Sequence, residues 1–218
     1  QRAGVPSGGP ITTAITIGIR DLDGYARSAR ALADHPWIKI KVAQNAPLDA
    51  IATVHREAPN AKLVVDPNQA WSVAELREIA PRLVEPGPSL LEQPVPTIGA
   101  HDLISYTSPI PICADEAANT VADLPHLVGR YQFVNIKLDK TGGLTEALKF
   151  ARASQDAGLR LMVGCMVGGS VAMAPSMILG QLCDVCDLDG PVLQAEDWPG
   201  GIVYDKGVMT PPWPHFWG

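Results

Sequence analysis

The sequence predicts an α/β fold in which eight mainly parallel strands alternate with helices and close into a barrel. Two observations support this prediction. Short runs rich in β-branched residues alternate with helix-like segments along all 218 residues. In addition, Lys41, Asp66, Glu92, Asp115, Lys137, Cys165 and Asp187, which lie at or near the ends of these runs, follow one another at intervals of 22 to 28 residues. That interval is the length of one strand–helix unit.

The individual elements follow from local patterns in chain order. Strands are expected at residues 13–19, 37–42, 62–66, 89–93, 111–115, 132–138, 160–165 and 184–189. Helical segments are expected at 23–34, 47–58, 72–83 and 143–158. Ser72 with Glu75 three residues later forms a capping-box pattern, and Gly158 is typical of a helix end.

The barrel is expected to be of the TIM type, either a complete (β/α)8 barrel or a modified (β/α)7β barrel. A doubly wound open sheet is the alternative fold. Such a sheet usually has fewer strands and carries a glycine-rich phosphate loop after its first strand. The segment 16–24, TIGIRDLDG, offers no such loop.

Composition excludes several classes of partner. The net charge of -6 leaves no basic patch for nucleic acid, and no apolar stretch is long enough to span a membrane. Cys183 and Cys186 form a C-x-x-C pair without a second Cys/His pair, which argues against a zinc site. We expect the four cysteines to be free thiols in the cytoplasm.

Charged residues gather at the predicted strand ends. Lys39 and Lys41 share one face of their strand, because successive side chains point to opposite faces. The residues beside the charged positions are apolar and should face the helices: Ile40, Val65, Leu91, Ala114, Ile136 and Leu188. Burying so many charges in a barrel is costly unless they are paired or bind a metal. We therefore interpret this end as a functional site.

The chemistry of the charges suggests a metal and two proton carriers. Asp66, Glu92 and Asp115 end three successive strands and would offer oxygen ligands to Mg²⁺. Lys41 and Lys137 lie on the second and sixth strands, opposite each other, where one can remove a proton and the other deliver one. Lys39 beside Lys41 would help to lower the pKa of Lys41. The alternative is that the carboxylates cap helices or pair with the lysines.

These residues resemble the enolase superfamily over nearly the whole chain. The matching motifs are KIK (39–41), DPNQAW (66–71), LLEQP (90–94), CADE (113–116), VNIKLDKTGGL (134–144), GCM (164–166) and DLDGP (187–191). The paired lysines resemble the muconate-lactonising branch. The D-x-D motif on the eighth strand is similar to that of the dipeptide epimerases.

The resemblance implies a role for each candidate residue. Asp66, Glu92 and Asp115 would bind Mg²⁺; Lys41 and Lys137 would be the acid/base pair, with Lys39 supporting Lys41. Asp187 and Asp189 would hold the ammonium group of a dipeptide. The implied reaction is a 1,1-proton transfer at the carbon alpha to the C-terminal carboxylate, through a metal-stabilised enediolate.

The resemblance also implies a domain plan. Residues 1–12 would be the remnant of a linker from a missing N-terminal capping domain, and residues 13–190 the catalytic barrel. Residues 191–218 would pack on the barrel or on the cap. Because the cap sets much of the specificity in this family, the preferred side chains of the substrate are not predicted. A homo-oligomer is expected, with a separate capping-domain chain as a further possible partner.

Two groups of alternatives to a dipeptide epimerase stay open. A cycloisomerase, an o-succinylbenzoate synthase or an N-acylamino acid racemase of the same branch would act on a substrate without a free ammonium group. Asp187 and Asp189 argue against these. The second alternative is a truncated barrel that has no turnover of its own and binds a ligand or a capping chain.

Overall fold

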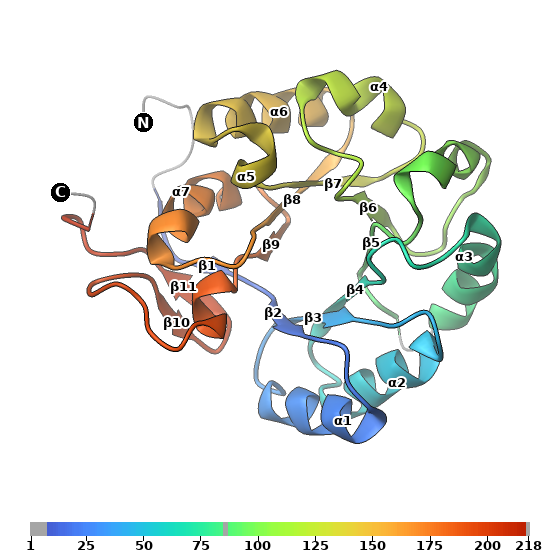
Figure 1. Cartoon of the computed structure of the whole chain (residues 1–218), viewed down its shortest axis with the longest axis horizontal. Coiled ribbons are helices and arrows are strands. Elements are labelled where there is room, and N and C mark those ends of the chain that lie inside the picture. Colours follow the sequence, from blue (N-terminus) through green and yellow to red (C-terminus); the bar gives the residue numbers. More distant parts are fainter. Residues whose placement is uncertain (1–7, 85–86, 217–218) are drawn as a thin grey trace.

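The computed structural model describes residues 8–84 and 87–216. One parallel sheet carries eight strands in chain order and curls into a nearly closed barrel, which is seen end-on in Figure 1. Its strands are β2 (Ile15–Ile17), β3 (Trp37–Lys41), β4 (Lys62–Asp66), β5 (Leu90–Glu92), β6 (Ile112–Ala114), β7 (Phe133–Ile136), β8 (Arg160–Gly164) and β9 (Val185–Asp187). The predicted barrel and its eight strands are confirmed.

Helices surround the barrel on the outside (Figure 1). They are α1 (Leu22–Ala31), α2 (Pro47–Glu57), α3 (Val73–Ile79), α4 (Leu124–Leu127), α5 (Leu138–Thr141), α6 (Leu144–Asp156) and α7 (Ser170–Gly180). The predicted capping box is present, with the Ser72 side chain accepting from the Glu75 N–H at 3.1 Å. None of the helices within 8–84 and 87–216 is long and apolar enough to cross a membrane.

Some connections differ from regular helices. Short 3₁₀ segments occur at Ala80–Leu83, Thr97–Ser105, Val121–Asp123 and Gly190–Leu193. The strand predicted at 132–138 ends earlier, at Ile136, so Lys137 is the N-cap of α5. The reason is that Leu138–Thr141 form one helical turn, which ends at Gly142 with a left-handed φ of 83°.

The interior of the barrel is layered because every second residue of a strand points inward. An apolar layer contains Trp37, Val64, Leu90, Cys113, Phe133, Met162 and Val185. The residues two positions further along the same strands are Lys39, Asp66, Glu92, Asp115, Asn135, Gly164 and Asp187. The intervening apolar residues, such as Ile40 and Val65, are fully buried in the larger core cluster, as the sequence predicts.

Contacts between the first and last strands nearly close the ring. The Ala14 N–H donates to the Cys186 carbonyl at 2.8 Å, just before β2 begins. The Leu188 N–H donates to Thr13 Oγ1 at 2.8 Å. The Thr16 N–H donates to Asp189 Oδ2 at 2.7 Å, so a predicted site residue takes part in the seam between β9 and β2.

A small antiparallel sheet lies beside the barrel. It contains β1 (Ile11–Thr12), β10 (Val203–Asp205) and β11 (Val208–Thr210), and β11 is its central strand. Tyr204 donates through its hydroxyl to the Leu188 carbonyl at 2.7 Å, which fixes the sheet to the end of β9. The predicted domain bounds stay predictions, and residues 1–7 of the proposed linker lie outside the described residues.

Candidate active site

A cavity of about 350 Å³ opens at the mouth of the barrel, the end at which the carboxyl ends of the strands lie. We call it the mouth cavity. Seven of the eight sequence-predicted site residues line it: Lys39, Lys41, Asp66, Asp115, Lys137, Asp187 and Asp189. The eighth, Glu92, is fully buried beside them. The structure therefore brings together the eight predicted site residues.

Lys39 is the cation at the centre of the cluster. Its Nζ lies 3.1 Å from Asp66 Oδ2, 2.7 Å from Glu92 Oε2 and 2.9 Å from Asp187 Oδ2. Burial alone would lower the pKa of Lys39, but Asp187, Glu92 and Asp66 outweigh it and raise this pKa well above its ordinary value. Lys39 is therefore charged at neutral pH and joins three strands through one ammonium group.

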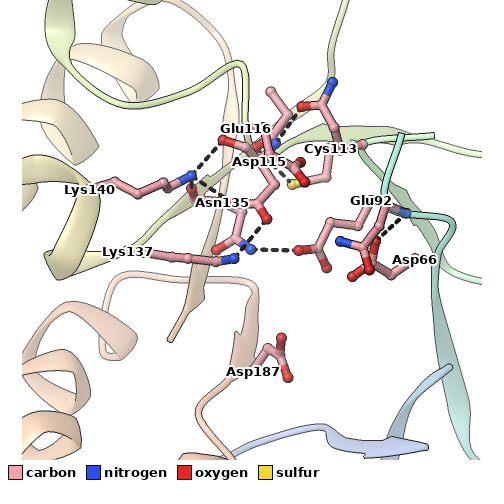
Figure 2. A network of polar contacts seen from close by, with 12 residues as sticks. Asp66, Glu92, Cys113, Asp115, Glu116, Asn135, Lys137, Lys140 and Asp187 are labelled. Carbon is pink, nitrogen blue, oxygen red and sulfur yellow. Dashed lines mark hydrogen bonds and ion pairs between the residues drawn. The ribbon is translucent and has the colours of Figure 1, made fainter. Parts of the chain in front are cut away.

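Glu92 is a fully buried carboxyl group of the cluster. Its Oε1 accepts a hydrogen bond from Asn135 Nδ2 at 2.8 Å, as drawn in Figure 2. Its Oε2 forms the ion pair with Lys39 but accepts no hydrogen bond. Burial raises the pKa of Glu92 to about 8; Lys39 opposes this rise, and the nearby carboxylates add to it. A further positive charge at this position would favour the ionised form of Glu92 and lower its pKa.

Lys41 and Lys137 enter the mouth cavity from opposite sides. They come from β3 and from the end of β7, the second and sixth strands of the eight. Lys41 Nζ lies 3.2 Å from Asp66 Oδ2 and also donates to Asn68 Oδ1. Lys137 Nζ lies 2.7 Å from Asp115 Oδ2. Burial lowers the pKa of Lys137, but the negative charges of Asp115 and Glu92 outweigh burial. The pKa of Lys137 is therefore raised above its ordinary value.

Lys140 and Asn135 belong to the site although the sequence analysis did not select them. Lys140 Nζ lies 2.7 Å from Asp115 Oδ1 and donates to the Asn135 carbonyl at 3.1 Å (Figure 2). Burial raises the pKa of Asp115, but Lys140 and Lys137 outweigh it and lower this pKa. Asn135 shares the face of Lys137 two residues on, and Lys140 lies three residues after Lys137. This spacing from Lys137 could have predicted both residues as members of the site.

Asp187 and Asp189 lie on the side of the cavity where the end of β9 meets the seam strand β2. Asp187 Oδ2 accepts from Lys39, while its Oδ1 is buried and accepts no hydrogen bond. Asp189 Oδ2 accepts from the Thr16 N–H, and burial together with Asp187 raises the pKa of Asp189. A buried carboxylate oxygen without a donor is an available acceptor for a cationic ligand group.

The chemistry of Asp66, Glu92 and Asp115 fits a hard cation such as Mg²⁺, which prefers carboxylate oxygens. Glu92 Oε2, buried without a hydrogen bond, supports that fit. As placed, however, the described residues contain no group of three His, Cys, Asp or Glu side chains that could hold a metal ion. In this structure ammonium groups pair with these carboxylates: Lys39 with Asp66 and Glu92, and Lys137 and Lys140 with Asp115.

Gly164 at the end of β8 leaves room for the site. A Cβ added there would lie 2.6 Å from Asn135 Oδ1 and 3.0 Å from Lys137 Cε. No side chain larger than a hydrogen atom fits this position without displacing one of the two. Gly164 therefore permits the close approach of Asn135 and Lys137 to the barrel wall.

Apolar side chains are exposed around the mouth. Val167 is 76% exposed and Ile98 is 90% exposed. Ile19, Met166 and Leu193 are also exposed, and the last two line the mouth cavity together with Val167. We call the three residues that line the cavity, Met166, Val167 and Leu193, the apolar rim.

The comparison with protein families agrees with this architecture. Residues 24–212 match the model of the enolase C-terminal domain-like family. The chain belongs to this family. The resemblance stated from the sequence is thereby confirmed, together with the barrel.

Relatives in this family include racemases and epimerases. An N-acetyl-D-glutamate racemase from Pseudoalteromonas is 40% identical over 203 residues, which cover 93% of this chain and 64% of that protein. The L-Ala-D/L-Glu epimerase of Escherichia coli is 37% identical over 91% of this chain and 63% of its own length. This chain thus spans less than two thirds of the length of either relative.

Solved structures agree in fold. An enolase family member from Agrobacterium tumefaciens with homology to dipeptide epimerases, which contains sodium and L-Ala-L-Glu, has a TM-score of 0.95 and 37% identity. The match covers all of this chain and 67% of that one. The dipeptide epimerase of Methylococcus capsulatus, complexed with Mg and L-Arg-D-Lys, has a TM-score of 0.87 and 27% identity over 96% of this chain and 63% of its own.

A substitution at Gly164 tests the packing of the site. We expect Gly164→Ala to lower the free energy of unfolding by about 1–3 kcal/mol, because the new methyl group overpacks against Asn135 and Lys137. Urea unfolding measures this change. Gly18→Ala is the control, since a Cβ there meets no atom within 4 Å. Equal stability of both variants would contradict the close approach.

Proposed function

We propose that the protein epimerises dipeptides by a 1,1-proton transfer that depends on Mg²⁺. The observation that carries this proposal is the placement of Lys41 and Lys137 at the ends of opposite strands of the ring, where both line one cavity. A carbon atom held between two lysines can lose a proton to one face and gain one on the other, which inverts its configuration. The relatives that are epimerases and racemases support the same reaction.

Each group has a part in the proposed chemistry. Asp66, Glu92 and Asp115 would hold the Mg²⁺ ion, and Lys39 keeps two of these carboxylates together. When bound, the ion would supply positive charge to the substrate carboxylate as the α-proton leaves. Lys41 and Lys137 would move the proton at the α-carbon of the C-terminal residue.

Asp187 and Asp189 support a dipeptide as the substrate. Their carboxylates line the cavity, and Asp187 Oδ1 has no donor in the described structure. A free ammonium group would supply that donor. A charge-assisted hydrogen bond of this kind contributes about 1.5–3 kcal/mol.

A racemase of N-acylamino acids is the second candidate. The observation that favours it is the N-acetyl-D-glutamate racemase, which is 40% identical to this chain. Its substrate carries no free ammonium group at the position that Asp187 and Asp189 would contact. The two candidates therefore differ at these aspartates and share the two lysines.

The apolar rim supports a covering element over the cavity. Val167 and Met166 line the cavity and are exposed, and exposed apolar surface beside a cavity commonly marks an interaction site. We propose a capping domain as this element, and the homo-oligomer stays a prediction. All four cysteines are free thiols, which supports a cytoplasmic location.

The two-lysine mechanism predicts opposite behaviour of two variants. Lys41→Arg and Lys137→Arg should each abolish net epimerisation of a dipeptide such as L-Ala-L-Glu. Each variant should still exchange the α-proton of one epimer with solvent, because the other lysine remains. The two variants should select opposite epimers. Proton NMR in D₂O with Mg²⁺, on both stereoisomers, measures the exchange.

Lys149→Arg is the matched control for these variants, because Lys149 pairs with Glu146 on the exposed surface of α6. It should epimerise like the unchanged protein. If both site variants lost all exchange, the lysines would act as charge stabilisers rather than as proton carriers. Unchanged epimerisation in either variant would remove that lysine from the chemistry.

The metal site predicts a loss of Mg²⁺ affinity in Asp115→Asn. We expect affinity to fall more than tenfold, which corresponds to roughly 1.4 kcal/mol, because the variant lacks one negatively charged ligand. Isothermal titration calorimetry with Mg²⁺ alone measures the change. Asp139→Asn is the control, since Asp139 is exposed on α5. Equal affinity of both variants would exclude Asp115 from the metal site.

If Asp187 and Asp189 bind the ammonium group of a dipeptide, a change at Asp189 should affect dipeptides more than N-acylamino acids. Asp189→Asn should lower kcat/KM for L-Ala-L-Glu by about 10- to 100-fold, since a charged hydrogen bond to the ammonium group is lost. The same change should affect N-acetylglutamate little. Asp205→Asn, on the small sheet, serves as the control. An equal loss for both substrates would argue against ammonium recognition at Asp189.

A further inference from the structure

Gln93 has an unusual conformation beside the carboxylate cluster. It follows Glu92 directly, is fully buried and has a φ of 34°, in the left-handed region that non-glycine residues seldom adopt. Such strain persists only where the surrounding contacts hold the residue in place, and it concentrates at functional sites. The contacts of Gln93 must therefore hold it in this conformation.

The side-chain amide of Gln93 uses all its hydrogen-bonding capacity. Its Oε1 accepts from the Asp115 N–H at 2.9 Å and from the Ala117 N–H at 3.1 Å. Its Nε2 donates to the Val95 carbonyl at 2.9 Å and to the Tyr131 hydroxyl at 3.1 Å. An amide has two acceptor positions and two donors, so each of them has a partner.

The backbone of Gln93 extends these contacts to a third strand end. Its N–H donates to the Cys113 carbonyl at 2.8 Å, and its carbonyl accepts from the Gln69 N–H at 2.8 Å. Gln69 and Asn68, which follow Asp66, also have left-handed φ angles of 64° and 46°. Gln93 thus holds the end of a strained turn that begins at Asp66.

One residue consequently joins the three segments that carry the three carboxylates. Asp66 precedes the turn held by the Gln93 carbonyl, Glu92 is its chain neighbour, and the Asp115 N–H is bound by its side chain. Figure 2 shows the Asp66, Glu92 and Asp115 side chains near one another at the strand ends. The cluster lies where Gln93 fixes the backbone.

We propose that Gln93 is a positioning residue that sets the relative placement of Asp66, Glu92 and Asp115 for cation binding. This inference rests on the proposed function for its cation, whereas the backbone contacts stand independently. A carboxamide suits the position because it presents two acceptor sites and two donors without charge. A glutamate there would lack both donors toward the Val95 carbonyl and the Tyr131 hydroxyl.

The test compares Gln93→Met with Gln132→Met in the 218-residue chain. Gln93→Met keeps the length of the side chain and removes its four hydrogen bonds. Gln132 is the matched control, because its Oε1 accepts from the Ile112 N–H at 2.9 Å, at the opposite end of the same strand β6. Both substitutions remove a glutamine bond to the backbone, but only one lies at the mouth.

Two measurements are made on each variant. The first is hydrogen exchange by NMR at the amides of Gln69, Asp115 and Ala117. We expect all three to exchange faster in Gln93→Met, including Gln69, whose acceptor is a backbone atom that the substitution retains. The second is calorimetric titration with Mg²⁺ alone, for which we expect affinity about 10- to 100-fold weaker, as for residues that support metal ligands. Gln132→Met should match the unchanged chain in both.

Stability is separated from positioning by Val185→Ala, a cavity substitution in the apolar layer beneath the charged residues. It should lower the melting temperature and leave Mg²⁺ affinity unchanged. If Gln93→Met does not fold, Tyr131→Phe tests the role of Gln93 instead, because this substitution removes one hydrogen-bond partner of Gln93 Nε2. We expect faster exchange at Asp115 and Ala117 in that variant, with a smaller loss of affinity.

The outcomes distinguish the two proposals. If the unchanged chain binds no Mg²⁺, the proposed metal site fails, and the exchange of the three amides alone decides the role of Gln93. If it binds Mg²⁺ and Gln93→Met binds it equally well, Gln93 does not position the carboxylates. Unchanged exchange at Gln69 would likewise overturn the inference, since Gln93 would then act only through its two side-chain acceptor bonds.

Discussion

The ammonium group of Lys39 is the interaction on which the rest of the site depends. It is 4% exposed and lies within 3.1 Å of carboxylates on β4, β5 and β9. Separated from this cation, those carboxylates would repel one another in a medium that solvates charge poorly. The charged layer can exist inside the barrel because its carboxylates pair with ammonium groups within the layer, and an apolar layer lies beneath it.

Much of this arrangement could be predicted because the strand period is two. Once Lys39 and Lys41 are assigned to one face, the inward positions of Asp66, Glu92 and Asp187 follow from the spacing of the strands. The partners of these charges were harder to predict. Lys140 reaches Asp115 from a helical turn after β7, and Gln93 acts through backbone atoms of two neighbouring loops. Such contacts depend on loop conformation, which strand periodicity does not determine.

The ends of the elements were also less predictable than the elements themselves. β7 stops before Lys137 because a helical turn begins there, and the strands β1, β10 and β11 have only two or three residues each. These three strands lie outside the repeating strand–helix pattern that revealed the barrel strands, and the pairing of β1 with β11 joins residues about two hundred positions apart. Only the folded chain brings such segments together.

The seam between β9 and β2 has a consequence for folding. Its contacts join residues 173 positions apart, as in the bond from the Thr16 N–H to Asp189 Oδ2. Closing so long a loop costs conformational entropy before the contact can contribute any stabilisation. Neighbouring strands with local connections therefore pair more readily. We therefore expect the seam, which fixes Asp189, to be the last part of the barrel to form. Until the seam forms, the cavity lacks the side that Asp189 lines.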